Sequence, residues 1–146
     1  MNASRYGLGF HHYGLAVREE GPARKFLEGL GYTVGELITD PLQQVRVSLA
    51  RAAGMPTVEL VLPTDQPGPI TSLLKSRDAM VYHSCYTTRD AGATLAAIAG
   101  DGLDLMTVSE AKPAILFHGL NVSFHYVAGF GLIELIHIDA SRTIAL

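Results

Sequence analysis

A short strand-like sequence that contains a histidine occurs twice in this chain of 146 residues. The first copy is FHHYGLAV at residues 10–17, and the second is VYHSCYTT at residues 81–88. Both combine apolar, β-branched and aromatic residues, which is typical of a strand. Each copy is followed by a segment with helical features and, further on, by a strand with a lone glutamate. The repeated order of elements predicts two similar modules, which would cover each other's free sheet faces and leave a concave cleft.

The first half of the chain, residues 9–62, predicts the order strand, helix, strand, strand, strand. Gly21 and Pro22 suit the start of a helix. The apolar positions 23, 26, 27 and 30 then follow the spacing of an amphipathic helix. Strands are expected where apolar segments lie between glycine and proline turn signals, at residues 9–17, 32–39, 44–50 and 57–62.

The second half repeats this order after a linker at residues 63–78, which begins with a proline-rich stretch and includes a short helix near 69–76. The second module is expected at residues 79–138. It contains an alanine-rich helix at 91–99 and a loop at 112–119. Its strands are expected at 81–88, 103–108, 121–127 and 132–138. We therefore predict one domain, residues 1–146, made of two βαβββ modules.

Composition excludes several classes of protein. The formal net charge of −3 and the pI near 6.0 argue against a nucleic-acid or anionic-membrane partner. Because no apolar run approaches the length of a membrane span and the first residues lack a signal-peptide plan, we expect a soluble cytoplasmic protein. The single cysteine, Cys85, rules out an intramolecular disulfide and suits a reducing compartment.

Four residues in equivalent positions of the two halves are candidate metal ligands. His12 and His83 lie in the first strand of each half, and Glu59 and Glu134 lie in the last. Two imidazoles and two carboxylates suit a divalent first-row metal such as Zn, Ni, Co, Mn or Fe. Strand alternation places His11 on the face opposite His12. On the residues alone, solvent-facing glutamates are the alternative, because four ligands on four strands form no local motif.

Several stretches resemble the vicinal oxygen chelate (glyoxalase/bleomycin-resistance/dioxygenase) superfamily, and most of all its methylmalonyl-CoA epimerase-like branch. They are FHHYGLAV with the following ARKFLEGLGY, then VELVLP, GPITSLLKSRDAMVYHSCYTT and GFGLIELIH, and they run from Phe10 to His137. The resemblance implies an α+β fold in which the two βαβββ modules pair into a curved mixed sheet that encloses a metal-binding cleft. It also implies a homodimer.

The resemblance further selects the metal ligands. In this family one divalent ion is held by a histidine two residues before the glycine of the first strand, here His12. The other ligands correspond to Glu59, His83 and Glu134. All four positions are filled by residues that can bind a metal, and the identity of the metal stays open among Zn, Co, Ni, Mn and Fe.

The chemistry implied by the resemblance is proton transfer at the carbon next to the carbonyl of a thioester, such as an acyl-CoA. The metal would act as a Lewis acid that stabilises the enolate. Epimerisation requires two acid/base groups, and Glu134 is the first of them by resemblance. Some epimerases carry the second carboxylate on the third strand. Here no acidic residue occurs between Asp40 and Glu59, and the strand offers Arg46 and Ser48 instead.

His125 is a local candidate for the second acid/base group. A turn through residues 128–131 would set His125 opposite Glu134, and opposed residues on paired strands share a face. An imidazole there could exchange protons near neutral pH. The alternative is a hydrogen-bonded histidine with no catalytic role.

Other residues and other functions stay open. Cys85 shares a face with His83, and His118 falls in a loop that closes over substrate in this family. A CoA phosphate could be contacted by Arg46, Arg51, Lys75 or Arg77, although a solvated surface position is the alternative for each.

Three other activities compete with the epimerase. A glyoxalase I-type lyase uses the same proton-transfer logic and a similar ligand set. The stretches GPITSLLK and VYHSCY favour the epimerase branch over it. An extradiol dioxygenase is disfavoured, because Glu59 would occupy a position that oxygen or catechol needs. A metal-free small-molecule-binding protein would not need all four ligands.

Overall fold

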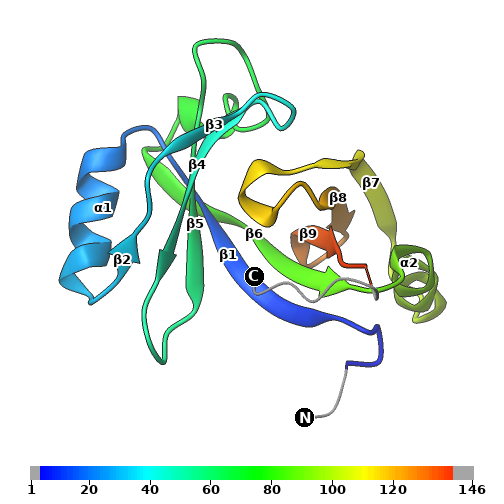
Figure 1. Ribbon diagram of the computed structural model, residues 1–146. Coiled ribbons are helices and arrows are strands. Elements are labelled where there is room, and N and C mark those ends of the chain that lie inside the picture. Colours follow the sequence, from blue (N-terminus) through cyan, green and yellow to red (C-terminus); the bar gives the residue numbers. More distant parts are fainter. Residues whose placement is uncertain (1–3, 140–146) are drawn as a thin grey trace. The chain divides into compact units, whose positions relative to one another are not determined.

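The computed structural model describes residues 4–139, which contain two α-helices and nine β-strands (Figure 1). The chain divides into two compact units. The first unit is His12–Tyr82, and the second unit combines Met1–His11 with His83–Leu146. None of the helices in the described part of the chain has the length and apolar character that crossing a membrane requires.

The first unit is a small sheet covered by one helix. Its strands are ordered β2-β4-β5-β1, and β3 also pairs with β4. β1 and β5 are parallel, whereas β4 pairs antiparallel with β5. The elements that contribute to this unit are β1 (Gly9–Val17), α1 (Glu20–Gly29), β2 (Thr33–Val34), β3 (Ile38–Asp40), β4 (Val45–Arg51), β5 (Thr57–Leu62) and the 3-10 turn η1 (Leu73–Lys75).

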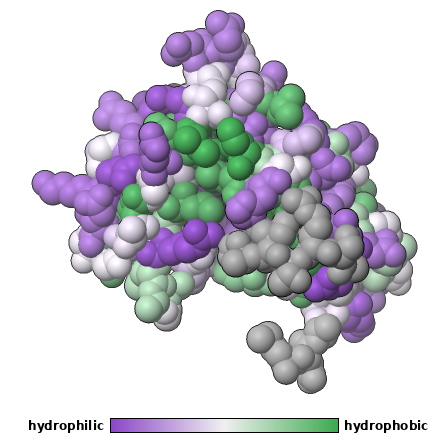
Figure 2. Space-filling model, viewed as in Figure 1, coloured by the Kyte–Doolittle hydropathy of each residue, from purple (hydrophilic) through white to green (hydrophobic). Residues whose placement is uncertain are grey.

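α1 packs on one face of this sheet, and the other face carries the candidate metal ligands His12 and Glu59. Leu27 of the helix joins a core with Val17, Ala50, Leu60 and Leu62. Hydrophilic side chains gather on the outer surface of α1 (purple, left of Figure 2). Because neighbouring strand residues point to opposite faces, burying Leu60 and Leu62 under α1 turns Glu59 to the face away from the helix.

The second unit repeats the plan with the order β6-β9-β8-β7. β6 and β9 are parallel, and β8 pairs antiparallel with both β9 and β7. The N-terminus of α2 is capped by the Asp90 carboxylate, which accepts a hydrogen bond from the Ala93 N–H. The elements that contribute to this unit are β6 (Ala79–Thr88), α2 (Ala91–Gly100), β7 (Leu105–Pro113), the 3-10 turn η2 (Ile115–Phe117), β8 (Asn121–Val127) and β9 (Gly131–His137).

The predicted order of elements is confirmed, with local corrections. The strand expected at residues 32–39 is two short strands, because the backbone carbonyl of Gly35 bonds to side chains of Ser48 and Arg24 instead of continuing the ladder. The helix expected near 69–76 is only the turn η1. β7 is longer than the predicted segment 103–108, and register shifts with bulges occur along its pairing with β8.

Truncating Leu60 to alanine should destabilise the first unit by about 2–5 kcal/mol, because Leu60 is fully buried in the core under α1. The control is Leu30→Ala at the end of the same helix, where the side chain is 47% exposed and the loss should stay below about 1 kcal/mol. Urea unfolding followed by circular dichroism measures both. Equal losses in the two variants would contradict the assignment of this core.

Candidate metal centre

The first unit brings His12 and Glu59 together on one sheet face. β1 and β5 run parallel with His12 opposite Thr57 and Gly14 opposite Glu59, so both side chains point to the same side. Gly14 has no side chain to occupy the space beside Glu59. The His12 Nε2 atom lies 3.4 Å from the Glu59 Oε1 atom, and both residues are buried.

The second unit repeats this arrangement with His83 and Glu134. β6 and β9 are also parallel, and Cys85, two residues after His83, lies opposite Glu134. The His83 Nε2 atom is 3.1 Å from the Glu134 Oε1 atom, and both residues are again buried. The Phe124 ring packs edge-on against the His83 ring, with 5.4 Å between the centroids. Each unit therefore presents one buried imidazole–carboxylate pair.

These separations fit two ligands of one metal ion. With metal–nitrogen and metal–oxygen distances of about 2.0–2.2 Å, neighbouring ligand atoms of a tetrahedral or octahedral site lie about 2.9–3.5 Å apart. The two pairs, at 3.4 and 3.1 Å, fall within this range. Imidazole nitrogen and carboxylate oxygen are ligands of divalent first-row metals. In each unit the pair thus has the donor chemistry and spacing to hold such an ion.

The structure separates the two neighbouring histidines of β1. His12 is fully buried, whereas His11 is partly exposed and its ring meets the Phe117 ring edge-on at 5.4 Å. The different burial of the two neighbours agrees with the expectation that His11 lies on the face opposite His12. Cys85 is fully buried on the face of His83, as the strand alternation predicts.

The predicted pairing of His125 with Glu134 is wrong by one residue. Phe124 lies opposite Glu134, and His125 lies opposite Ile133. Gly131, with φ +130°, already pairs with Val127, so the hairpin loop has three residues instead of the expected four. His125 therefore points to the opposite face of the sheet from Glu134, and the geometric argument for its catalytic role is lost.

His125 instead belongs to a hydrogen-bonded cluster that the sequence did not suggest. Its Nε2 atom lies 2.8 Å from the Ser123 hydroxyl, which is also 2.8 Å from the His137 Nε2 atom. The Thr107 hydroxyl lies 2.9 Å from the Nδ1 atom of His125. The only sequence signal was the alternate spacing of Ser123 and His125, but linking them to His137 required the β8–β9 register.

The third strand of the first module offers no acid/base group beside Glu59. Leu49 lies opposite Glu59 and Ser48 lies opposite Leu60, so Arg46 and Ser48 share the α1 face and cannot replace a catalytic carboxylate. Arg46 donates a hydrogen bond to the Pro63 carbonyl. Asp40 is buried, and its Oδ1 atom accepts hydrogen bonds from the Leu42 and Gln43 N–H groups, which holds the turn into β4.

The βαβββ order, with a histidine–glutamate pair on parallel strands, is typical of glyoxalase-like proteins. The chain belongs to the Glyoxalase/Bleomycin resistance protein/Dioxygenase superfamily, whose model matches residues 11–124. The resemblance seen in the sequence is thereby confirmed at the level of the superfamily. A comparison with the curated proteins finds no match.

Solved structures share the fold at low identity. The methylmalonyl-CoA epimerase from Mycobacterium tuberculosis is 21% identical, with a TM-score of 0.74 over 97% of this chain and 94% of that one. A hypothetical protein from Bacillus halodurans is 20% identical, with a TM-score of 0.76 over 95% and 98% of the two chains. The Streptomyces coelicolor methylmalonyl-CoA epimerase in complex with 2-nitronate-propionyl-CoA is 20% identical, with a TM-score of 0.66 over 90% and 96%. These likenesses confirm the predicted α+β, glyoxalase-like fold.

The His125–Ser123–His137 cluster should make the protein less stable in acid. Burial lowers the pKa of both histidines below the ordinary value of 6.5; the charge of His137 lowers that of His125 further, and Glu110 partly opposes this. The folded state thus binds protons less readily than the unfolded state. The contribution of the neutral histidines to the free energy of unfolding is therefore complete above pH 6.5 and is lost as the pH falls through that value toward the lowered pKa.

His137→Gln removes one titrating group but keeps a hydrogen-bonding side chain near Ser123. Its unfolding free energy, measured in urea at about pH 8 and about pH 5, should fall less on acidification than that of the wild type. His118→Asn is the control, because His118 is exposed and has a φ of 57°, which asparagine tolerates. An identical acid loss in His137→Gln and the wild type would contradict the role of the cluster.

Proposed function

We propose that this protein is a divalent-metal-dependent isomerase or epimerase that moves a proton at the carbon α to a thioester carbonyl. The observation that carries the proposal is the pair of buried histidine–glutamate couples on equivalent parallel strands of the two units. Membership of the glyoxalase superfamily supports it. So does the fold shared with methylmalonyl-CoA epimerases, one of which is described in complex with methylmalonyl-CoA.

The proposed metal ligands are His12, Glu59, His83 and Glu134. In this proposal residues 1–146 form one domain in which the modules 9–62 and 79–138, joined by the linker 63–78, act on one ion. Four buried ligands with two carboxylates would balance the charge of a divalent cation, and a cation would remove the cost of burying those carboxylates. A bound ion would supply Lewis-acid stabilisation of the negative charge that develops on the substrate carbonyl oxygen.

Glu134 is proposed to be one of the two acid/base groups, the one that takes the α-proton from one face of the substrate carbon. Its carboxylate is buried on β9, where Phe124 of β8 and Cys85 of β6 lie opposite it. A carboxylate held away from water interacts strongly with a nearby proton donor, because the local dielectric is low. We further infer that the enzyme is a cytoplasmic homodimer and that its substrate is an acyl-CoA or a related thioester.

A glyoxalase I-type lyase is the second candidate function, because its reaction also moves a proton next to a carbonyl in a sulfur-linked substrate. The same donor set, two imidazoles and two carboxylates, serves both reactions. The two candidates differ in substrate: a branched acyl thioester for the first and a hemithioacetal of methylglyoxal and glutathione for the second. The two functions are therefore distinguished by which substrate the protein turns over, because both predict the same bound metal.

Metal binding is tested with the purified protein. Elemental analysis should find about one divalent ion per chain, and Co²⁺ or Zn²⁺ added to the chelator-treated protein should raise its Tm by about 5 °C or more. His83→Ala and Glu59→Gln should each weaken this response strongly, whereas His118→Asn should respond like the wild type. A wild-type protein with neither bound metal nor a shift in Tm would rule out the metal-enzyme proposal.

The reaction is tested by solvent deuterium exchange into the α-carbon of methylmalonyl-CoA, followed by mass spectrometry. The wild type should exchange this proton, and Glu134→Gln should slow the exchange by about 100-fold or more, since the amide cannot accept it. Turnover of the methylglyoxal–glutathione hemithioacetal is measured in parallel. Turnover of the hemithioacetal without exchange in the thioester would favour the lyase over the epimerase.

A further inference from the structure

Arg51 ends β4 on the same sheet face as the His12–Glu59 pair. Leu49 lies opposite Glu59 and Ala50 opposite Val58, so the continuation of this register places Arg51 beside Thr57. Thr57 in turn lies opposite His12. The three residues therefore form one row across β4, β5 and β1. With strands about 4.8 Å apart, the Cα atoms of Arg51 and His12 lie about 10 Å from each other.

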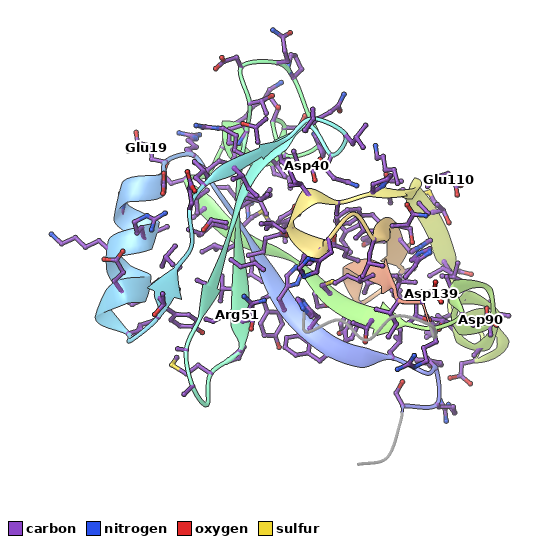
Figure 3. All side chains as sticks on the ribbon, viewed as in Figure 1. Glu19, Asp40, Arg51, Asp90, Glu110 and Asp139 are labelled. Carbon is purple, nitrogen blue, oxygen red and sulfur yellow. The ribbon has the colours of Figure 1, made fainter. Side chains whose placement is uncertain are left out.

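The side chain of Arg51 is a cation without a protein partner in the described part of the chain. It is exposed, and it makes no hydrogen bond or ion pair with any residue in 4–139. Figure 3 shows it on the side of the sheet away from α1. Arg18 and Arg24 of this unit are engaged: Arg18 binds the Leu74 and Lys75 carbonyls, and Arg24 binds Glu20.

On this face Arg51 lies between Thr33 of β2 and Thr57 of β5, and the positions beyond these two threonines are mostly apolar or small. The face carries Val45, Val47 and Leu49 from β4, and it carries Gly14 and Ala16 from β1. Among the residues of β1, β4 and β5 that share this face, Arg51 is the only lysine or arginine. Arg51 is thus the one guanidinium that this face offers to an anionic group of a ligand held at the His12–Glu59 pair.

We propose that Arg51 binds a carboxylate on the acyl group of the substrate and so selects dicarboxylic acyl thioesters; this rests on the proposed thioester isomerase function. A guanidinium offers two parallel N–H donors that match a carboxylate. In a malonyl-type acyl group the carboxylate is attached to the same carbon that loses its proton, so it lies close to the thioester carbonyl. The phosphates of CoA are separated from that carbonyl by the whole pantetheine arm, which disfavours them as partners of a residue only two strands from His12 in the same row.

The proposal is tested with Arg51→Met, Arg51→Lys and the control Arg89→Met, an exposed arginine of the second unit. Exchange of the α-proton is measured on methylmalonyl-CoA and on methylmalonyl-N-acetylcysteamine, which carries no phosphate. Arg51→Met should lose about 10- to 100-fold in kcat/KM on both thioesters. Arg51→Lys should recover part of this loss, and Arg89→Met should match the wild type.

Calorimetry gives a readout that does not depend on turnover. Arg51→Met should bind methylmalonyl-CoA about 10-fold or more weakly, and isobutyryl-CoA, which has a methyl group in place of the free carboxylate, as tightly as the wild type. A loss on CoA thioesters alone would assign Arg51 to a phosphate and overturn the proposal, as would wild-type behaviour of Arg51→Met on every substrate. A wild type that exchanges no thioester proton would refute the proposed function, whereas the calorimetric comparison would still decide the role of Arg51.

Discussion

Parallel pairing of the first and last strands of each module is the constraint on which the site depends. In β1–β5 and in β6–β9 the histidine and the glutamate belong to strands that run in the same direction, with a helix and further strands between them in the chain. Parallel strands cannot be joined by a tight turn, so the crossover is needed to bring the two residues side by side. The helix that provides the crossover also covers the opposite sheet face.

Burial under the helices then fixes which side chains face the site. In the first unit Leu60 and Leu62 pack under α1, and the intervening positions must turn away from it. The same alternation in β9 buries Ile133 and Leu135 beside Ile98 of α2 and directs Glu134 to the other face. The orientation of the carboxylates is thus a consequence of hydrophobic packing, which costs several kcal/mol to disrupt.

Features that depend on the repeated order of elements and on strand alternation could be predicted from the sequence. The strand register that depends on the exact length of one turn could not. The order of elements and the faces of His12 and His83 followed from periodic patterns around these two histidines. The β8–β9 register did not, because Gly131 joins the strand and shortens the loop, which no apolar pattern reveals. The splitting of the expected strand 32–39 likewise depends on tertiary hydrogen bonds to Gly35 from Ser48 and Arg24. The proposed role of Arg51 needed the registers of two strand pairs.

The shared hydroxyl of Ser123 has a consequence for Glu134, the proposed metal ligand on the neighbouring strand. A hydroxyl has one hydrogen to give, so it donates to one imidazole and accepts from the other. When both are neutral, His125 and His137 must therefore hold complementary tautomers. The hydrogen bonds that link them through Ser123 form only when β8 and β9 pair in the observed register. A shift of the β8–β9 register by one residue would break these hydrogen bonds and would turn Glu134 into the apolar core under α2. The cluster thus stabilises the register in which the Glu134 carboxylate faces away from that core.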